Sequence, residues 1–193
     1  MAQKKTTEEL VNERAAFAEA TAGQGRTPIT VVVDNVRSLD NVGLLFRLCE
    51  TARVEKLYLT GYTGYPEVLG DERPKHVIAR HTRRIEKTAV YALPHQPWEH
   101  VEDAVGLVGR LKEEGNQIVA LEQTDTSVPY HTADYSLPIT LIVGHERRGV
   151  QKELLELADT IIDIPILGLG NSHNVAISTG IVLYHMLDKT KRI

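Results

Sequence analysis

Apolar and polar residues alternate along the chain in two distinct patterns. Short apolar runs rich in Val, Ile and Leu are typical of buried strands, and apolar residues three and four apart indicate helices with one buried face. Strands are predicted at residues 28–35, 56–61, 117–123, 139–144 and 160–164. Helices are predicted at residues 7–22, 41–54, 97–115, 152–158 and 174–189. Residues 75–95 fit neither pattern clearly.

Local signals mark several helix ends. Asp40 or Asn41 is expected to cap the second helix, and Asn174 stands at the start of the last one. Gly115 is expected to end the helix over residues 97–115. Because strands and helices alternate, the sequence predicts an α/β fold with a mostly parallel sheet and flanking helices.

Composition narrows the class of protein. The chain has 193 residues, of which 42% are apolar and 25% charged, as expected of one globular domain. No apolar run reaches the roughly 18 residues of a membrane span, and the opening MAQKKTTEELVNER is too polar for a secretory signal. Cys49 is the single cysteine, which excludes an intramolecular disulfide and a zinc–cysteine cluster. We therefore expect a cytoplasmic protein with no membrane contact and no metal.

The charge is unevenly distributed. A net charge of −4 argues against a protein that coats nucleic acid nonspecifically. The segment RPKHVIARHTRRIEK (residues 73–87) is nevertheless strongly basic, with Glu86 as its single acid. Such a segment is either a solvated charged face or a surface that contacts phosphates.

Candidate chemistry gathers where three predicted strands end. In parallel sheets ligands bind beyond the carboxyl ends of strands, and here these ends carry DNVRSLDN, GHERRG and GLGNSHN. The last stretch, IDIPILGLGNSHNVAIS, suggests a dinucleotide-binding turn. However, His173 occupies the position of the third glycine, and too few residues follow for the strand that would bear the acidic ribose ligand. A Rossmann dehydrogenase is therefore excluded.

Taken together, the three loops resemble a specific family. NVRSLDNVGLLFR, IVGHERRGV and IDIPILGLGNSHNVAIS resemble the three motifs of the SpoU, or TrmH-like, branch of the SPOUT RNA methyltransferases. The resemblance extends from about residue 28 to residue 187. We accordingly divide the chain into an N-terminal helical extension (residues 1–27) and a SPOUT methyltransferase domain (residues 28–193).

The resemblance implies a fold and a function that periodicity does not reveal. It implies an α/β sheet whose C-terminal segment threads a deep trefoil knot, a topology too rare to infer from patterns. It also implies S-adenosylmethionine as the cofactor and a homodimer with the last helix in its interface. The implied activity is transfer of a methyl group to a ribose 2′-hydroxyl of structured RNA, either tRNA or rRNA.

The resemblance also implies roles for individual residues. The implied catalytic residues are Arg47, Asn41, Glu146, Ser172 and Asn174. The implied cofactor-binding residues are Leu121, Glu122, Gln123, Val143, Gly144, Glu146, Ile164, Ile166, Leu169, Ser172 and Asn174. The expected RNA-binding residues are Arg47, Arg80, Arg83, Arg84 and Arg147. No metal is needed, because a sulfonium is itself electrophilic and the enzyme must mainly align the 2′-oxygen with the methyl group.

Arg47 is the expected centre of this chemistry. It is better suited to polarising the hydroxyl while holding the adjacent phosphate than to acting as a base, since guanidinium stays protonated. His173 departs from the family pattern, and we expect it to point into the core, with RNA contact as the alternative. Two other functions stay open: a non-catalytic dimeric RNA-binding protein of the same fold, and a base-methylating SPOUT enzyme.

Overall fold

The computed structural model describes residues 4–6, 8–10, 12–13, 16 and 25–193. Within the helix expected over residues 7–22, the described residues 8–10, 12–13 and 16 are helical, and the rest of that prediction lies outside the described residues. In the described part of the chain, every helix is too short or too polar to traverse a lipid bilayer.

A seven-stranded sheet forms the centre of the molecule, and all its strands are parallel. The strand order is β3-β2-β1-β6-β4-β7-β5. The strands are β1 (Thr27–Asp34), β2 (Val54–Thr60), β3 (Trp98–Val101), β4 (Gln117–Leu121), β5 (Val128–Pro129), β6 (Ile139–Val143) and β7 (Thr160–Asp163). The predicted parallel α/β architecture is thus confirmed.

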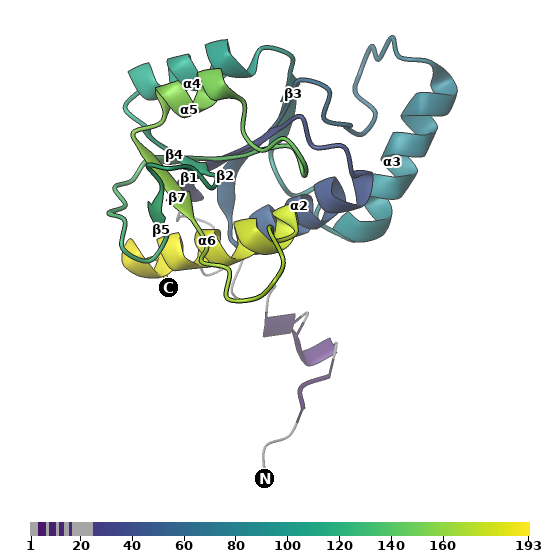
Figure 1. The fold of residues 1–193 in the computed structure, drawn as a ribbon. Helices are drawn as coiled ribbons and strands as arrows, with labels where there is room; N and C mark the ends of the chain where they lie inside the picture. Colours follow the sequence, from purple (N-terminus) through teal and green to yellow (C-terminus); the bar gives the residue numbers. More distant parts are fainter. Residues whose placement is uncertain (1–3, 7, 11, 14–15, 17–24) are drawn as a thin grey trace.

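Helices cover both faces of this sheet (Figure 1). They are α2 (Leu39–Thr51), α3 (Lys75–Ala89), α4 (Ala104–Glu113), α5 (Lys152–Leu157) and α6 (Val175–Lys189). α2 and α6 lie on one face and α4 and α5 on the other, while α3 packs beside α2 (Figure 1). Residues 75–95, which the pattern left undecided, thus contain a helix.

Successive strand residues pack on opposite faces, and this explains the continuous apolar runs. In β1, Val31 and Val33 join the core beneath α2 and α6, whereas Val32 joins the core beneath α4 and α5. In β6, Leu141 and Ile142 divide in the same way. A strand buried on both faces needs apolar residues at every position rather than at alternate ones.

The helix predicted over residues 97–115 is wrong at its start. Residues 98–101 form the edge strand β3, in register with β2, and Trp98 packs edge-on against Phe46 with ring centroids 5.6 Å apart. α4 begins only after Asp103, whose carboxylate accepts a hydrogen bond from the Gly106 N–H at 2.9 Å. Gly115 follows α4 with a φ of 88°, as expected of a residue that ends a helix.

The cap of α2 also differs from the prediction. The Ser38 hydroxyl accepts a hydrogen bond from the Asn41 N–H at 3.2 Å, so Ser38 is the cap and the helix begins at Leu39. The expected caps, Asp40 and Asn41, lie within the first turn, and their side chains are therefore free to bond elsewhere. Asn174 caps α6 as predicted.

Candidate active site

The carboxyl ends of β4, β6 and β7 open into a cavity of about 580 Å³. Its walls come from the loops that the sequence singled out. The predicted cofactor residues in the lining are Leu121, Glu122, Gln123, Val143, Gly144, Glu146, Ile164 and Ser172. Ile166, Leu169 and Asn174 do not line it. The structure therefore gathers most of the predicted cofactor residues around one cavity.

A chain of side-chain hydrogen bonds joins the three motif loops beside this cavity. The amide of Asn41 on α2 donates to the Glu146 carboxylate at 3.2 Å. The carbonyl oxygen of the same Asn41 accepts from the Asn174 amide at 3.0 Å. Asn41 is 8% exposed, so neither bond competes freely with water. Three predicted catalytic residues, more than 130 positions apart at their extremes, are thus in direct contact.

The α6 cap fixes the direction of every bond in this chain. The Asn174 carbonyl oxygen accepts from the Ala176 and Ile177 N–H groups at 2.9 and 3.3 Å. Its amide nitrogen must therefore point toward Asn41 and donate. Asn41 then presents its oxygen to Asn174 and its nitrogen to Glu146. Residue 146 must therefore accept the hydrogen bond from the Asn41 amide, as an ionised carboxylate does.

Further donors hold the Glu146 carboxylate. The Arg37 and Ser38 N–H groups, just before α2, donate to it at 3.2 and 3.0 Å. Partial burial acts to raise the pKa of Glu146, but the backbone N–H groups and the Asn41 amide outweigh burial, and the net pKa lies below the ordinary value. Glu146 is therefore a fixed anion that ties the loop after β6 to the start of α2.

The loop after β6 folds back on itself so tightly that it needs glycine. A Cβ on Gly144 would lie 2.4 Å from the Gly149 carbonyl group and from the Val150 nitrogen. Gly149 has a φ of 70°, and a Cβ there would lie 1.9 Å from the Glu122 carboxylate. That carboxylate accepts from the Val150 N–H at 2.7 Å. The two glycines thus let the backbone of this loop form a cavity wall.

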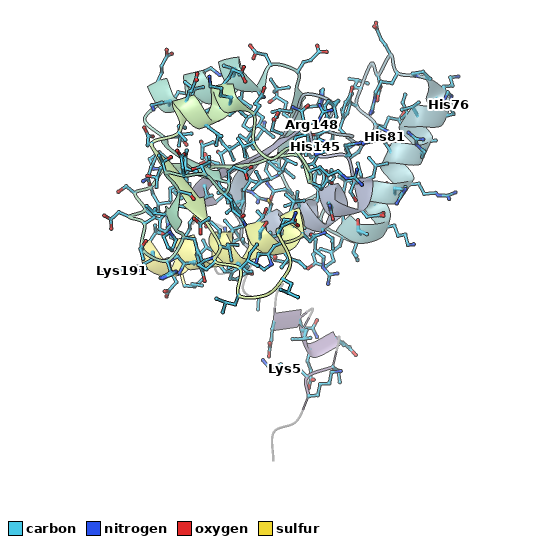
Figure 2. All side chains as sticks on the ribbon, viewed as in Figure 1. Lys5, His76, His81, His145, Arg148 and Lys191 are labelled. Atoms are coloured by element: carbon cyan, nitrogen blue, oxygen red, sulfur yellow. The ribbon has the colours of Figure 1, made fainter. Side chains whose placement is uncertain are left out.

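His145 stabilises the same loop from within. Its backbone exchanges two hydrogen bonds with Gly149, at 3.1 and 2.8 Å. Its ring Nδ1 accepts from the Arg147 and Arg148 N–H groups at 2.9 and 3.4 Å, which places the ring proton on Nε2. Although Nδ1 is 4.0 Å from Glu146, an accepting nitrogen cannot form an ion pair there. Figure 2 shows His145 and Arg148 together at the loop end of the sheet.

Arg47 lies apart from the cavity. It is exposed on α2, and none of the described residues bonds to its side chain. Six positions separate it from Asn41, which places the two side chains about 120° apart around the helix. Leu44 and Thr51, one turn earlier and one turn later on the helix, are exposed as well. The structure therefore brings Asn41, Glu146 and Asn174 together but leaves Arg47 outside their cluster.

In the loop before α6, the position of His173 differs from the prediction. His173 was expected to point into the core, yet it is exposed and lines the cavity together with Ser172. The adjacent Leu167 and Leu169 are almost fully exposed. Because α6 begins only at Val175, the preceding residues stand above the sheet end rather than against the core.

The predicted RNA-binding arginines occupy two places. Arg80, Arg83 and Arg84 are exposed on α3, and Arg147 is exposed in the loop after β6. Arg84 forms an ion pair with Asp40 of α2, so its charge is partly neutralised within the protein. Of the α3 arginines, Arg80 and Arg83 are left to face solvent without an acidic partner among the described residues.

Sequence reasoning missed some residues at this end of the sheet. Asp34, the last residue of β1, is buried and accepts hydrogen bonds from Thr60, Asn35 and Gln151 at 2.9, 3.0 and 3.2 Å. Burial raises its pKa despite these donors. The sequence signal that could have identified Asp34 is an acidic residue placed directly after an apolar run. Asp163 also lines the cavity and accepts from the Ser127 hydroxyl at 2.7 Å.

Comparison with known proteins places this arrangement in a family. The SpoU rRNA Methylase family matches residues 28–184. The tRNA (guanosine(18)-2′-O)-methyltransferase of Aquifex aeolicus is 33% identical over 156 residues, which are 81% of this chain and 67% of that protein.

Solved structures agree with this match. The Aquifex aeolicus TrmH/SpoU tRNA modifying enzyme superposes with a TM-score of 0.70 at 26% identity, over 95% of this chain and 85% of that one. The AdoMet-bound rRNA methyltransferase from Sinorhizobium meliloti superposes with a TM-score of 0.67 at 27% identity, over 83% of this chain and 56% of that one. The chain therefore spans between about half and most of the length of these relatives. The match over residues 28–184 includes all three loops that meet at Asn41, and on this basis the chain belongs to the SpoU rRNA Methylase family.

Proposed function

We propose that this protein is an S-adenosylmethionine-dependent RNA methyltransferase that modifies a ribose 2′-hydroxyl of tRNA or rRNA. The observation that carries the proposal is the hydrogen-bonded chain Glu146–Asn41–Asn174, which joins all three family loops beside the cavity. The similarity to a tRNA 2′-O-methyltransferase supports the reaction, and the similarity to an rRNA methyltransferase leaves the RNA class open.

The cavity fits the cofactor. A volume of about 580 Å³ is within the usual range for small-molecule sites. The close approach of Gly144 and Gly149 presents backbone rather than side chains to a ligand. The lining carries three carboxylates, Glu122, Glu146 and Asp163, against two arginines, Arg147 and Arg148, so it offers acidic groups to a sulfonium and basic groups to an anionic part of the ligand or RNA. The residues that would hold the cofactor are those of the lining, with Ser172 among them.

The chain's own residues would then perform distinct tasks. When bound, S-adenosylmethionine supplies a methyl group that its positive sulfur makes electrophilic. Arg47 would hold the phosphate next to the target ribose and polarise the 2′-hydroxyl, which suits a planar guanidinium better than an ammonium. Glu146, Asn41 and Asn174 would keep α2, and with it Arg47, in a constant position relative to the cavity.

A homodimer would account for an exposed apolar face of α6. Ile177, Ile181 and Tyr184 are exposed at helical spacing on this helix, and Leu44 of α2 is exposed as well. Leu48 of α2 lies against Gly180, so α2 and α6 are neighbours there. Arg47 therefore borders the proposed interface, where a second copy could bring it near the partner's cavity. Such an arrangement would explain why one chain alone leaves Arg47 outside its own cavity.

Three further features belong to the proposal. We place a deep trefoil knot in the C-terminal segment, supported by the superposition on SpoU structures. We keep the division into an extension over residues 1–27 and a methyltransferase domain over residues 28–193. We also expect a cytoplasmic protein, since the single Cys49 is buried and unpaired.

The decisive experiment concerns Arg47. Methyl transfer from labelled S-adenosylmethionine to unmodified tRNA and rRNA transcripts should fall by about 10²- to 10³-fold in Arg47→Ala, as when one preorganised donor to a reacting oxygen is lost. Cofactor affinity by calorimetry should be unchanged, and Arg47→Lys should rescue activity poorly. Arg110→Ala, an exposed arginine on α4 at the opposite face, is the matched control.

Each outcome separates the candidate functions. Transfer by the wild-type protein supports an enzyme, and its absence despite RNA binding would favour the non-catalytic RNA-binding alternative. Nucleoside analysis of the product distinguishes ribose from base methylation. Normal turnover in Arg47→Ala would show that another residue carries the chemistry.

A further inference from the structure

Tyr62 is an exposed aromatic side chain that the proposed reaction does not explain. It lies two residues after Thr60, the end of β2, and is 56% exposed. It stands at the end of the sheet that carries the cavity, beside the loops after β1 and β6. Its ring is therefore accessible at the end of the sheet where a substrate would approach the cavity.

The backbone around Tyr62 is held in place by several bonds. The Tyr62 N–H donates to the Asn35 side chain at 3.1 Å. The next residue, Thr63, is buried, and its hydroxyl donates to the Val33 carbonyl and accepts from the Val36 N–H, both at 3.0 Å. Gly61 before it has a φ of 59°, and a Cβ there would lie 2.3 Å from the Asn35 side-chain oxygen. The ring is therefore displayed from an ordered turn.

The ring of Tyr62 also has a defined neighbour. It meets the His145 ring edge-on, with centroids 6.2 Å apart and an angle of 80° between the planes. His145 is buried and locked by its own loop, as described above. Such an edge contact orients Tyr62 beside the loop of Glu146 and leaves much of its surface to solvent.

Three arginines lie on the two loops that contact Tyr62, the loop after β1 through Asn35 and the loop after β6 through His145. Arg37, Arg147 and Arg148 are exposed, and among the described residues none bonds to their guanidinium groups. The backbone N–H of Arg37 donates to Glu146, so the Arg37 backbone lies next to the Glu146–Asn41–Asn174 chain. An exposed aromatic ring with arginines on the loops that contact it suits a nucleotide, because the ring can stack on a base while an arginine binds the phosphate.

We propose that Tyr62 is a stacking surface for a nucleobase of the RNA substrate, with Arg37 binding a neighbouring phosphate. This inference rests on the proposed RNA methyltransferase function and adds to it a specific contact for the nucleotide that approaches the cavity. Stacking tolerates any base, so Tyr62 contributes affinity and orientation, whereas sequence preference must come from other contacts.

A salt titration separates stacking from charge. Binding of unmodified tRNA and rRNA transcripts is measured for the wild type and for Tyr62→Ala, Tyr62→Leu, Tyr62→Phe and Arg37→Gln at several salt concentrations. Tyr62→Ala should weaken binding by roughly 5- to 150-fold, the range for loss of one base–aromatic stack, and leave the slope of log K against log salt unchanged. Arg37→Gln should reduce the magnitude of that slope by about 1, which is the contribution of one phosphate contact. Tyr62→Phe should bind like the wild type and Tyr62→Leu like Tyr62→Ala.

The results distinguish this inference from the proposed function. Equal RNA affinity of Tyr62→Ala and the wild type, or equal affinity of Tyr62→Leu and Tyr62→Phe, would overturn the stacking role. Reduced affinity for S-adenosylmethionine or a lower melting temperature in Tyr62→Phe would make the residue structural and overturn it as well. A wild-type protein that binds RNA through Tyr62 but transfers no methyl group would instead contradict only the proposed function.

Discussion

Replacing Asn41 with Asp tests the hydrogen-bonded chain at its centre. The two side chains have the same shape, but Asp cannot donate to Glu146, whose carboxylate lies 3.2 Å from the Asn41 nitrogen. The substitution therefore exchanges a charge-assisted hydrogen bond for two facing carboxylates. It also leaves the Asn174 amide able to donate, so the effect is confined to the Glu146 side.

The loss of stability in Asn41→Asp is limited by the smaller of two free energies, the repulsion between the two carboxylates or the protonation of one of them. Two carboxylates about 3 Å apart repel by roughly 5 kcal/mol at an effective dielectric of about 20. Protonating one carboxyl of ordinary pKa at pH 7 costs about 4 kcal/mol. Since Glu146 is partly solvated, we expect the free energy of unfolding at pH 7 to fall by about 2–4 kcal/mol, or about 4–16 °C in Tm for a chain of this size.

The pH dependence has a definite sign. In Asn41→Asp, one carboxyl of the folded pair has a raised pKa, so the folded state binds more protons than the unfolded state and stability falls as pH rises. From pH 7 to pH 5 the difference in free energy of unfolding between the wild type and Asn41→Asp should shrink by about 2–3 kcal/mol. In the wild type the Glu146 pKa is lowered, so its contribution is present above the unfolded pKa and is lost only as pH falls through the folded value.

Urea denaturation at pH 5, 6, 7 and 8 measures this difference. Asn41→Ala should lose about 1.5–3 kcal/mol with no pH dependence over this range, because a hydrogen bond to a charged group is lost without repulsion. Asp40→Asn is the matched neighbour, and because its ion pair with Arg84 is exposed we expect a change of at most about 1 kcal/mol. If Asn41→Asp were as stable as the wild type at pH 7, Asn41 would not donate to Glu146.

Three further predictions address other parts of the site. Gly149→Ala should lower the free energy of unfolding by about 1–3 kcal/mol and weaken S-adenosylmethionine binding in calorimetry, because its φ is positive and its Cβ would strike Glu122; unchanged affinity would separate this loop from the cofactor. Charge reversal at Arg80 and Arg83 should weaken RNA binding and flatten its salt dependence in filter binding while cofactor affinity stays constant, and an unchanged slope would make α3 only a solvated face. Ile181→Glu should yield monomers in analytical ultracentrifugation because it places a charge in the proposed α6 interface, and a dimer of unchanged affinity would place the interface elsewhere.

Local sequence patterns were sufficient for most of the fold. Apolar runs identified the five strands at residues 28–35, 56–61, 117–123, 139–144 and 160–164. The runs are longest in β1 and β6, because a strand covered on both faces needs apolar residues at every position. The edge strand β3 was not predicted in this way. Trp98 and Val101 continue the helical spacing of α4, and only their pairing with β2 makes them a strand. Pairing between distant segments is a tertiary interaction that no local pattern contains.

The same division holds for the site. The residue types and spacing of the three loops were enough to nominate Asn41, Glu146 and Asn174, since those loops follow strands that end at one edge of the sheet. Their mutual bonds, the exposed position of His173 and the separation of Arg47 from the cavity depend on how α2 and α6 pack on the sheet. Sequence alone thus determined which groups gather beyond the carboxyl ends of the strands. Tertiary packing decided which of these groups touch, because hydrogen bonds require positions accurate to tenths of an ångström.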